Sequence, residues 1–244
     1  MSKEPFNRET ESYYSINSWT KDNPGLVAGI TTRWGGVSTE PFQSLNMGLH
    51  VGDDESSVVR NRQLLASSLM MPVESWAAAE QTHGNNIHKV GEVDKGKGSE
   101  YYHTSIKDTD GFITRDENIL LTMCYADCVP LYFLDKVSGT IGLAHAGWKG
   151  TVSQIGPKMV DAYMEKGTSM SSLEVVIGPS ICKNCYVVDD YVIDKVKKTL
   201  EDENNLPYNL KEEGQYYLDL KKLNEQLLVQ TGLNAEQIHT SSYC

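Results

Sequence analysis

The stretch PLYFLDKVSGTIGLAHA, residues 130–146, holds two apolar runs separated by a short polar segment. Each run is shorter than a typical helix, and its apolar character is nearly continuous. This pattern is typical of β-strands that are covered on both faces. The run LEVVIG at 173–178 has the same character. These segments therefore predict strands in the interior of a layered fold.

Segments on either side of this core predict further strands and helices. Apolar or β-branched runs predict strands at Leu26–Thr32, Trp76–Thr82, Asn86–Val90 and Ile119–Tyr125. Helical spacing predicts helices at Glu55–Met70, Ile155–Lys166, Asp190–Leu200 and Leu218–Thr231.

The order of these elements is mixed, with strand pairs interrupted by helices. It predicts a single α/β or α+β domain over residues 1–244, built in layers around a mixed sheet. Asp53 or Ser56 is expected to cap the helix that begins at Glu55. The polar segments 92–109 and 201–215 are expected to be exposed connections.

The charge of the chain limits its partners. The 244 residues carry a formal charge of −11, and an acidic protein repels a polyphosphate backbone, so no nucleic-acid partner is expected. A small anionic substrate is still compatible, because a local pair of basic side chains can outweigh distant charges that solvent screens.

The sequence also predicts a cytoplasmic location. No run approaches the ~20 apolar residues of a membrane helix, so no membrane partner is expected. The polar segment MSKEPFNRETESYYS, at 1–15, lacks the apolar core of a secretory signal. The five cysteines are an odd number in a chain that is not small, which argues against a disulfide framework.

Three segments place reactive side chains beside glycine or at the ends of predicted strands. They are QTHG at 81–84, YADCVP at 125–130 and AHAGWKG at 144–150. Two imidazoles and one thiolate form a donor set suited to zinc, and three protein ligands leave a catalytic zinc one position for water or substrate. The residue types therefore indicate a catalytic zinc site of His83, Cys128 and His145, although their spacing alone does not connect them.

Other interpretations of these residues stay open. A histidine after a strand is often a hydrogen-bonded structural residue, and a cysteine in an apolar run is often buried and inert. The pairs Cys124/Cys128 and Cys182/Cys185 would together supply four thiolates for a structural zinc. Against this, residues four apart on an extended segment lie about 13 Å apart, at ~3.3 Å per residue.

A third interpretation makes Cys128 a nucleophile. His83 or His145 would then be its base, and Asp127 or an amide would orient that base, as in a cysteine hydrolase. Around a zinc site, Asp127 would instead orient a ligand or accept a proton, and Gln81 would hydrogen-bond a ligand.

Basic and polar side chains beside turns are candidates for binding phosphate or substrate. TTRWGG at 31–36 places Arg33 at a strand end, before a Gly-Gly turn whose N–H groups can face an anion. Lys149 would add a second positive charge, and Asn46 is a further candidate. A solvent-facing Arg33 beside a tight turn is the alternative.

Several motifs, in order along nearly the whole chain, carry a family resemblance. They are TTRWGGVS (31–38), PFQSLNMGLHVGDD (41–54), VVRNRQLL (58–65), QTHGNNIHKV (81–90), DTDGFIT (108–114), ADCVPLYFLD (126–135), GLAHAGWKGT (142–151) and VVIGPSICKNCYVV (175–188). Together they resemble the polyphenol-oxidase or laccase-like family, now regarded as purine nucleoside phosphorylases. The resemblance implies an αββα sandwich of mixed sheets, related to a group of cysteine hydrolases.

The resemblance also implies a site and an activity. Zinc would be held by His83, Cys128 and His145, and the substrates would be phosphate with adenosine, inosine or methylthioadenosine. Adenosine deamination would be a second reaction. A non-catalytic zinc protein, with Cys124 as a closing fourth ligand, is the alternative without activity.

The older family label is that of a copper-dependent phenol oxidase. The six histidines contain no His-x-His pair, which disfavours several copper sites. The resemblance implies a further short segment after Cys244, with an Arg that would help bind phosphate; either this end is missing from the sequence or the protein is naturally short.

Overall fold

A computed structural model describes residues 4–202 and 204–244. Its centre is a six-stranded sheet with the strand order β14-β10-β8-β9-β6-β5. These strands are Ile238–Thr240 (β14), Leu173–Ile177 (β10), Val129–Asp135 (β8), Ile141–Ala146 (β9), Gly111–Thr114 (β6) and Ile87–Lys89 (β5). The pairs β14/β10 and β5/β6 are parallel and the other pairs are antiparallel, so the sheet is mixed, as predicted.

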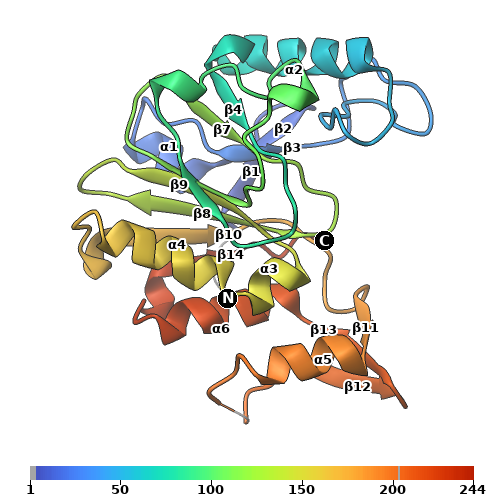
Figure 1. Cartoon of the computed structure of the whole chain (residues 1–244), viewed down its shortest axis with the longest axis vertical. Coiled ribbons are helices and arrows are strands. Elements are labelled where there is room, and N and C mark those ends of the chain that lie inside the picture. The colour runs from blue at the N-terminus through green and yellow to red at the C-terminus, as the bar shows by residue number, and fades with distance from the viewer. Residues whose placement is uncertain (1–3, 203) are drawn as a thin grey trace.

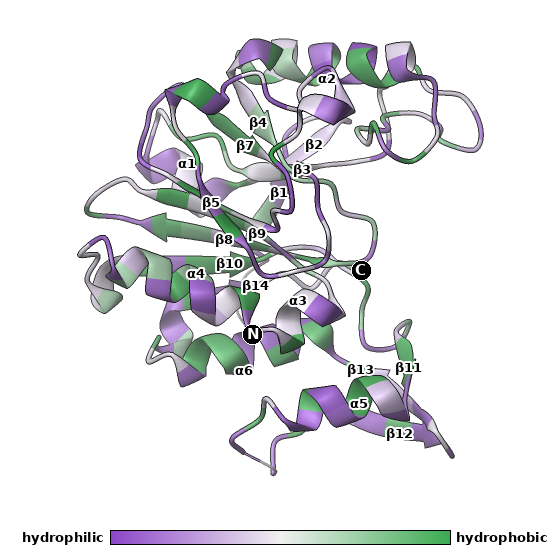
Figure 2. Cartoon of the chain, viewed as in Figure 1, coloured by the Kyte–Doolittle hydropathy of each residue, from purple (hydrophilic) through white to green (hydrophobic). Residues whose placement is uncertain are grey.

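The central strands are covered on both faces, which confirms the prediction from their continuous apolar runs. Every residue of β8 is buried, and β9 is buried from Gly142 onward. Figure 2 shows β8 and β10 largely in the colour of hydrophobic residues. A strand covered on both faces does not alternate between apolar and polar residues, because the side chains on each of its two faces are buried away from water.

One face of the sheet is covered by helices (Figure 1). They are α3 (Trp148–Val152), α4 (Ile155–Met164) and α6 (Leu220–Gln230). Ile155, Met159 and Tyr163 of α4 are fully buried against the sheet, as their helical spacing predicts. Pro157 lies in the first turn of α4. Backbone N–H groups in the first turn make no hydrogen bond within the helix, so the lack of an N–H on proline costs nothing there.

The opposite face carries a second layer of strands. The strands β1 (Phe6–Arg8), β2 (Tyr13–Ile16) and β3 (Gly29–Thr31) form one sheet, and β4 (Trp76–Ala78) pairs with β7 (Leu120–Thr122) in another. Phe6, Ile16 and Trp19, the last on α1 (Asn17–Asp22), pack on Tyr132 and Val176 of the central sheet.

Helix α2 (Glu55–Leu69) closes the outer side of this second layer, where Leu65 packs with Trp76 of β4. The layers are thus, in order, the helices α3, α4 and α6, the central sheet, the second layer of strands and helix α2. Figure 1 shows α2 and α6 at opposite sides of the molecule. This is the αββα arrangement that the family resemblance implies. Among the described residues, no helix combines the length and the apolar run that crossing a bilayer requires.

Several local predictions need correction. The N-cap of α2 is Asp54, which accepts the N–H of Ser57 at 2.8 Å, rather than Asp53 or Ser56. Asp53 accepts the side-chain amide of Asn46 at 2.9 Å, and Ser56 donates to Asp54 at 2.6 Å. The acidic residue nearest to the free N–H groups therefore makes the cap.

The two predicted connections also contain structure. Segment 92–109 is not wholly exposed, because Asp94 and Ser99 are buried. Segment 201–215, of which residue 203 lies outside the described part, contains β12 (Tyr208–Glu212). That strand belongs to a small sheet, β11-β13-β12, formed with β11 (Val187–Asp189) and β13 (Gln215–Leu218) and packed beside α5 (Asp190–Lys197). Residues 1–3 of the predicted polar N-terminal segment also lie outside the described part.

Asp135, at the end of β8, gives a pH-dependent contribution to stability. Its buried carboxylate accepts hydrogen bonds from the backbone of Val137 and from the hydroxyls of Ser138 and Thr168, at 2.6–3.0 Å. Burial alone would raise the pKa of Asp135, but these hydrogen bonds lower it from 3.8 to about 2. The ionised form is therefore the one that stabilises the fold.

We expect Asp135→Asn to lower the free energy of unfolding at pH 7 by about 1–3 kcal/mol, the usual cost of losing hydrogen bonds to a charged group. Because the folded pKa lies below the unfolded one, the stabilisation is present above about pH 4 and is lost as the pH falls toward 2. Urea unfolding from pH 7 to pH 3 should show the two proteins converging in acid. Asp161→Asn, on the exposed side of α4, is the control, and a gap independent of pH would contradict this role of Asp135.

Candidate metal and active site

Cys128 and His145 come from the two central strands of the sheet. Cys128 immediately precedes β8, and His145 lies in β9. The antiparallel register places His145 opposite Pro130, and paired strands lie about 4.8 Å apart. The thiol and the imidazole therefore meet at the same end of the strand pair.

His83 reaches the same place from the loop between β4 and β5. Its φ of 61° is in the left-handed region, which non-glycine residues seldom occupy. The loop is held because the backbone N–H groups of Thr82, His83 and Gly84 all donate to the carboxylate of Asp110, at 3.1, 3.1 and 2.7 Å. This single acceptor stabilises the unusual backbone conformation that aims the imidazole of His83.

Asp110 also orients His145. Its Oδ1 lies 2.8 Å from Nδ1 of His145, and both side chains are buried. The backbone N–H of His145 donates to the carbonyl of Asp110 at 2.8 Å. Because Nδ1 faces the carboxylate, Nε2 is left to bind a metal or a proton.

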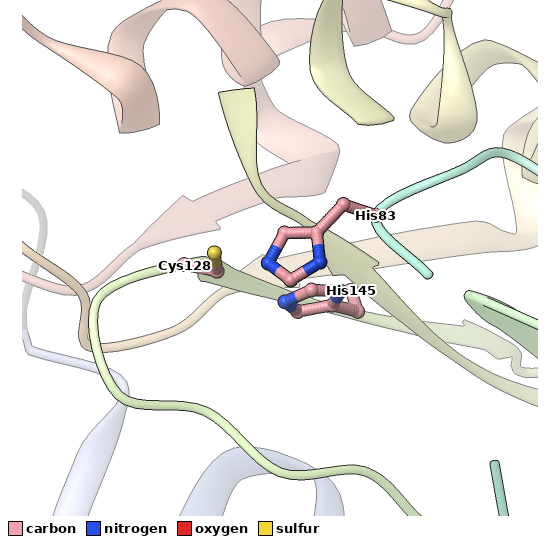
Figure 3. A group of neighbouring side chains, drawn as sticks. All are labelled: His83, Cys128 and His145. Atoms are coloured by element: carbon pink, nitrogen blue, oxygen red, sulfur yellow. The ribbon is translucent and has the colours of Figure 1, made fainter. Parts of the chain in front are cut away.

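The three side chains converge on one point. Figure 3 shows the rings of His83 and His145 close together, beside the sulfur of Cys128. One ligand atom from each residue lies within 4.8 Å of the others, and the two rings are 4.7 Å apart between centroids. Around a tetrahedral zinc such donor atoms are about 3.4–3.6 Å apart, given bond lengths of about 2.0–2.3 Å. The donor set and its spacing therefore fit zinc after small adjustments.

The two imidazoles have opposite pKa shifts. Burial lowers the pKa of His83, and the positive charges of His145 and Lys149 lower it further. Burial also acts to lower the pKa of His145, but hydrogen bonds with Asp110 and Cys128 raise it to about 9. Without a metal, His145 is therefore protonated at neutral pH, and a metal ion must displace that proton in order to bind.

Glycine is required next to these ligands. A Cβ on Gly147 would lie 2.8 Å from the sulfur of Cys128 and 3.1 Å from Cδ2 of His83. A Cβ on Gly150 would lie 2.8 Å from the carbonyl of Gly84. The two glycines of AHAGWKG therefore let β9 and α3 approach the loop of His83 closely.

Among the predicted anion-binding residues, Lys149 is brought to the site. It is exposed at the start of α3, and its charge acts on His83. Arg33 is exposed, and its Nε and one Nη donate to the carbonyl of Gln43 at 3.1 and 2.8 Å. Asn46 donates to Asp53 and accepts the N–H of Gly48, so its polar atoms support the loop.

Gln81 and Asp127 lie beside the ligands in different ways. The amide of Gln81 pairs with the backbone of Cys124, donating at 2.8 Å and accepting at 2.7 Å. It therefore ties the segment before Cys128 to the loop of His83, instead of hydrogen-bonding a metal ligand as predicted. The side chain of Asp127 is exposed, and its carbonyl accepts the N–H of Ile181 at 3.0 Å.

The predicted four-thiolate site is wrong for the described residues. Cys182 and Cys185 group with Cys244, while Cys128 groups with the two histidines. Cys124 lies beside the carbonyl of Met47, at 3.8 Å. It does not close the fourth position at His83, Cys128 and His145.

Comparison with known proteins identifies the family. The family model described as multi-copper polyphenol oxidoreductase laccase matches residues 27–244. The chain belongs to this family. The crystal structure of Bacillus licheniformis hypothetical protein YfiH has a TM-score of 0.95 and 43% sequence identity, and the match covers 98% of this chain and 89% of that one.

Curated relatives in this laccase-like family carry an enzyme name. Purine nucleoside phosphorylase YlmD from Bacillus subtilis (strain 168) is 47% identical over 244 residues, which cover 98% of this chain and 87% of the relative. The protein of the same name from Geobacillus stearothermophilus is 45% identical over 221 residues, covering 90% and 81%.

Asp110 and Tyr186 are site residues that the sequence interpretation missed, although both lie in motifs of the laccase-like family. The sequence gives only a weak indication that Asp110 is functional, namely an acidic residue just before a glycine and an apolar strand. Tyr186 follows the pair Cys182/Cys185 in a loop. Tyr186 is partly buried, and this burial raises the pKa of its hydroxyl to about 12.

We expect Asp110→Asn to lower the affinity for Zn²⁺ by about 10–100-fold, the usual effect of losing the carboxylate partner of a histidine ligand. A chelator-competition titration would measure it. Asp108→Asn is a matched control, because Asp108 bonds Thr82 and Asn86 but no imidazole. Thermal melts of both variants would separate unfolding from weaker binding, and equal affinities in two folded variants would refute the role of Asp110.

Proposed function

We propose that the protein is a zinc-dependent purine nucleoside phosphorylase that acts on adenosine, inosine and methylthioadenosine, with adenosine deamination as a second reaction. The proposal depends on the convergence of His83, Cys128 and His145 within 4.8 Å, in a chain 47% identical to a protein named purine nucleoside phosphorylase. Three protein donors leave room for substrate, and a bound zinc would supply Lewis acidity beside it. We propose small-molecule partners, because the acidic charge disfavours nucleic acid, and a cytoplasmic location.

Basic side chains would position phosphate. In phosphorolysis a phosphate oxygen forms a bond to C1′ of ribose while the bond from C1′ to the purine nitrogen breaks. Lys149 is exposed and close enough to influence His83, so its ammonium would hold phosphate at the site. Arg33 is anchored by Gln43 and keeps N–H donors for a second contact with the anion.

Two further residues would assist the leaving groups. The leaving purine gains a proton from water as the glycosidic bond breaks, and the hydroxyl of Tyr186 would donate a hydrogen bond to it, since the raised pKa keeps that proton on the tyrosine. In deamination a water oxygen forms a bond to the purine carbon and ammonia leaves. The exposed carboxylate of Asp127 would accept the proton of the water and pass it to the amine.

A cysteine hydrolase acting on a small amide is the second candidate, and one observation favours it. Cys128, His145 and Asp110 stand in the order nucleophile, base and orienter, with the last two 2.8 Å apart. The orienter is Asp110, not the predicted Asp127. Such an enzyme would survive chelation and lose activity when Cys128 is alkylated.

Metal analysis separates the remaining alternatives. The family description names copper, so copper bound with phenol-oxidising activity would support the older label. Zinc bound without any turnover would support a purely structural ion. The open arrangement of only three ligands among the described residues favours a catalytic ion.

We expect wild-type protein to convert inosine and phosphate to hypoxanthine and ribose 1-phosphate, to stop after chelation and to recover with Zn²⁺. Cys128→Ala should lose turnover and the zinc held at His83, Cys128 and His145, each by at least about 100-fold, since loss of a ligand costs more than loss of the hydrogen-bond partner of a ligand. Cys124→Ala, outside the ligand group, should keep both. An alanine variant at 128 that retains zinc and turnover would overturn the proposal.

We expect Lys149→Ala to raise the KM for phosphate by about tenfold or more, because one charge-assisted hydrogen bond contributes about 1.5–3 kcal/mol. Zinc content should not change, since Lys149 is not a ligand. Lys158→Ala, exposed on α4, controls for the loss of one positive charge. An unchanged KM for phosphate would exclude Lys149 as the phosphate-binding residue.

A further inference from the structure

A second group of thiols lies outside the site described above. Cys182, Cys185 and Cys244 are free cysteines, and their sulfur atoms lie within 4.8 Å of one another. Cys182 and Cys185 lie on the loop between β10 and β11, and Cys244 follows β14. Cys182 and Cys244, which are 62 positions apart in the chain, thus lie together at the surface.

The sheet topology brings these segments together. The strands β10 and β14 are parallel neighbours, with Ile177 opposite Thr240. Parallel strands leave a sheet at the same edge, and the N–H of Ser241 still donates to the carbonyl of Ile177 at 2.9 Å. Figure 1 shows the chain after β10 passing close to the end of the chain after β14. The convergence of the thiols is therefore fixed by the core.

Backbone hydrogen bonds hold the loop 182–185 in a turn. The N–H groups of Cys185 and Tyr186 donate to the carbonyl of Cys182 at 2.9 and 3.1 Å, which closes a tight turn. The N–H of Cys182 donates to the sulfur of Cys244 at 3.3 Å. This hydrogen bond orients the sulfur of Cys244 toward the loop.

Cys244 is held in place by its neighbours. The buried ammonium of Lys221 donates to the carbonyls of Ser241 and Tyr243 at 2.9 and 2.8 Å. The carboxylate of Glu4 accepts the N–H of Ser242 at 2.7 Å and the hydroxyl of Ser241 at 2.8 Å.

We propose that Cys182, Cys185 and Cys244 form a second metal site, for a thiophilic cation such as Zn²⁺. Three thiolates around one ion at about 2.3 Å are about 4 Å apart, so the observed group needs only a small contraction. A donor set made only of sulfur selects soft cations over Mg²⁺ and Ca²⁺. The exposure of Cys185 and Cys244 leaves the remaining position open to solvent.

The second site is connected to the first. The N–H of Ile181 donates to the carbonyl of Asp127 at 3.0 Å, and Asp127 immediately precedes the ligand Cys128. An ion at Cys182 and Cys185 would therefore order the loop that carries Tyr186. Its role would be to fix this wall of the first site, so the proposal does not depend on the reaction catalysed there.

The test counts zinc ions in the full-length, reduced protein. We expect two ions per chain in wild type, one in Cys185→Ser and one in Cys128→Ala, with none in the double variant. Cys124→Ser, a cysteine outside both groups, should keep two. With Co²⁺ as a probe, the sulfur-to-metal charge-transfer band should fall by more than half in Cys185→Ser, because the second site holds three thiolates and the first only one.

Two results would overturn the second site. One is a count of a single zinc ion per chain in wild type, with the same count in Cys185→Ser. The other is a disulfide between Cys182 and Cys185 in protein purified with a reductant, detected by mass spectrometry of its peptides. Failure of the proposed phosphorolysis would leave the ion count unchanged, so the two proposals can fail separately. Thermal melts would show that Cys185→Ser, at an exposed position, remains folded.

Discussion

A buried carboxylate is the constraint on which the candidate active site depends. Asp110 is fully buried, and a buried charge is costly unless hydrogen bonds compensate it. The compensation comes from three successive backbone N–H groups of the loop 82–84 and from the imidazole of His145. The loop and β9 cannot move apart without leaving this charge unpaired. The relative position of the two histidines is therefore set by one side chain that need not touch the metal.

The central sheet makes this position rigid. Cys128 and His145 stand at the ends of strands that are covered on both faces, and close-packed interiors resist small displacements. The absence of a side chain at Gly147 lets the loop of His83 approach both. A site with this support binds its ligand without first ordering its residues, which preserves binding free energy for the substrate.

The surrounding loops depend on a second set of buried polar groups. On α2, Asn61 bonds the loop 38–46 and Arg62 bonds the carbonyls of Met47, Gly98 and Ser99. The carbonyl of Met47, which Arg62 bonds, also lies 3.8 Å from the sulfur of Cys124, in the segment that leads to Cys128. On the other side, Ile181 joins the loop of the three thiols to Asp127. Both walls of the site are thus connected to the residues that flank Cys128.

The sequence by itself determined the layers and the residue types of the site. Continuous apolar runs predicted β8, β9 and β10, and helical spacing predicted α2, α4, α5 and α6, because burial imposes a period on the sequence. Short strands such as β6 and β14 gave no such signal. Only the tertiary structure decided which cysteines meet, since Cys182 and Cys185 join Cys244 and not Cys124. It also decided that Asp110, not Asp127, orients His145. These pairings depend on strand order and register, which bring together residues that are far apart in the chain. The sequence around each residue does not show which distant residue it will contact.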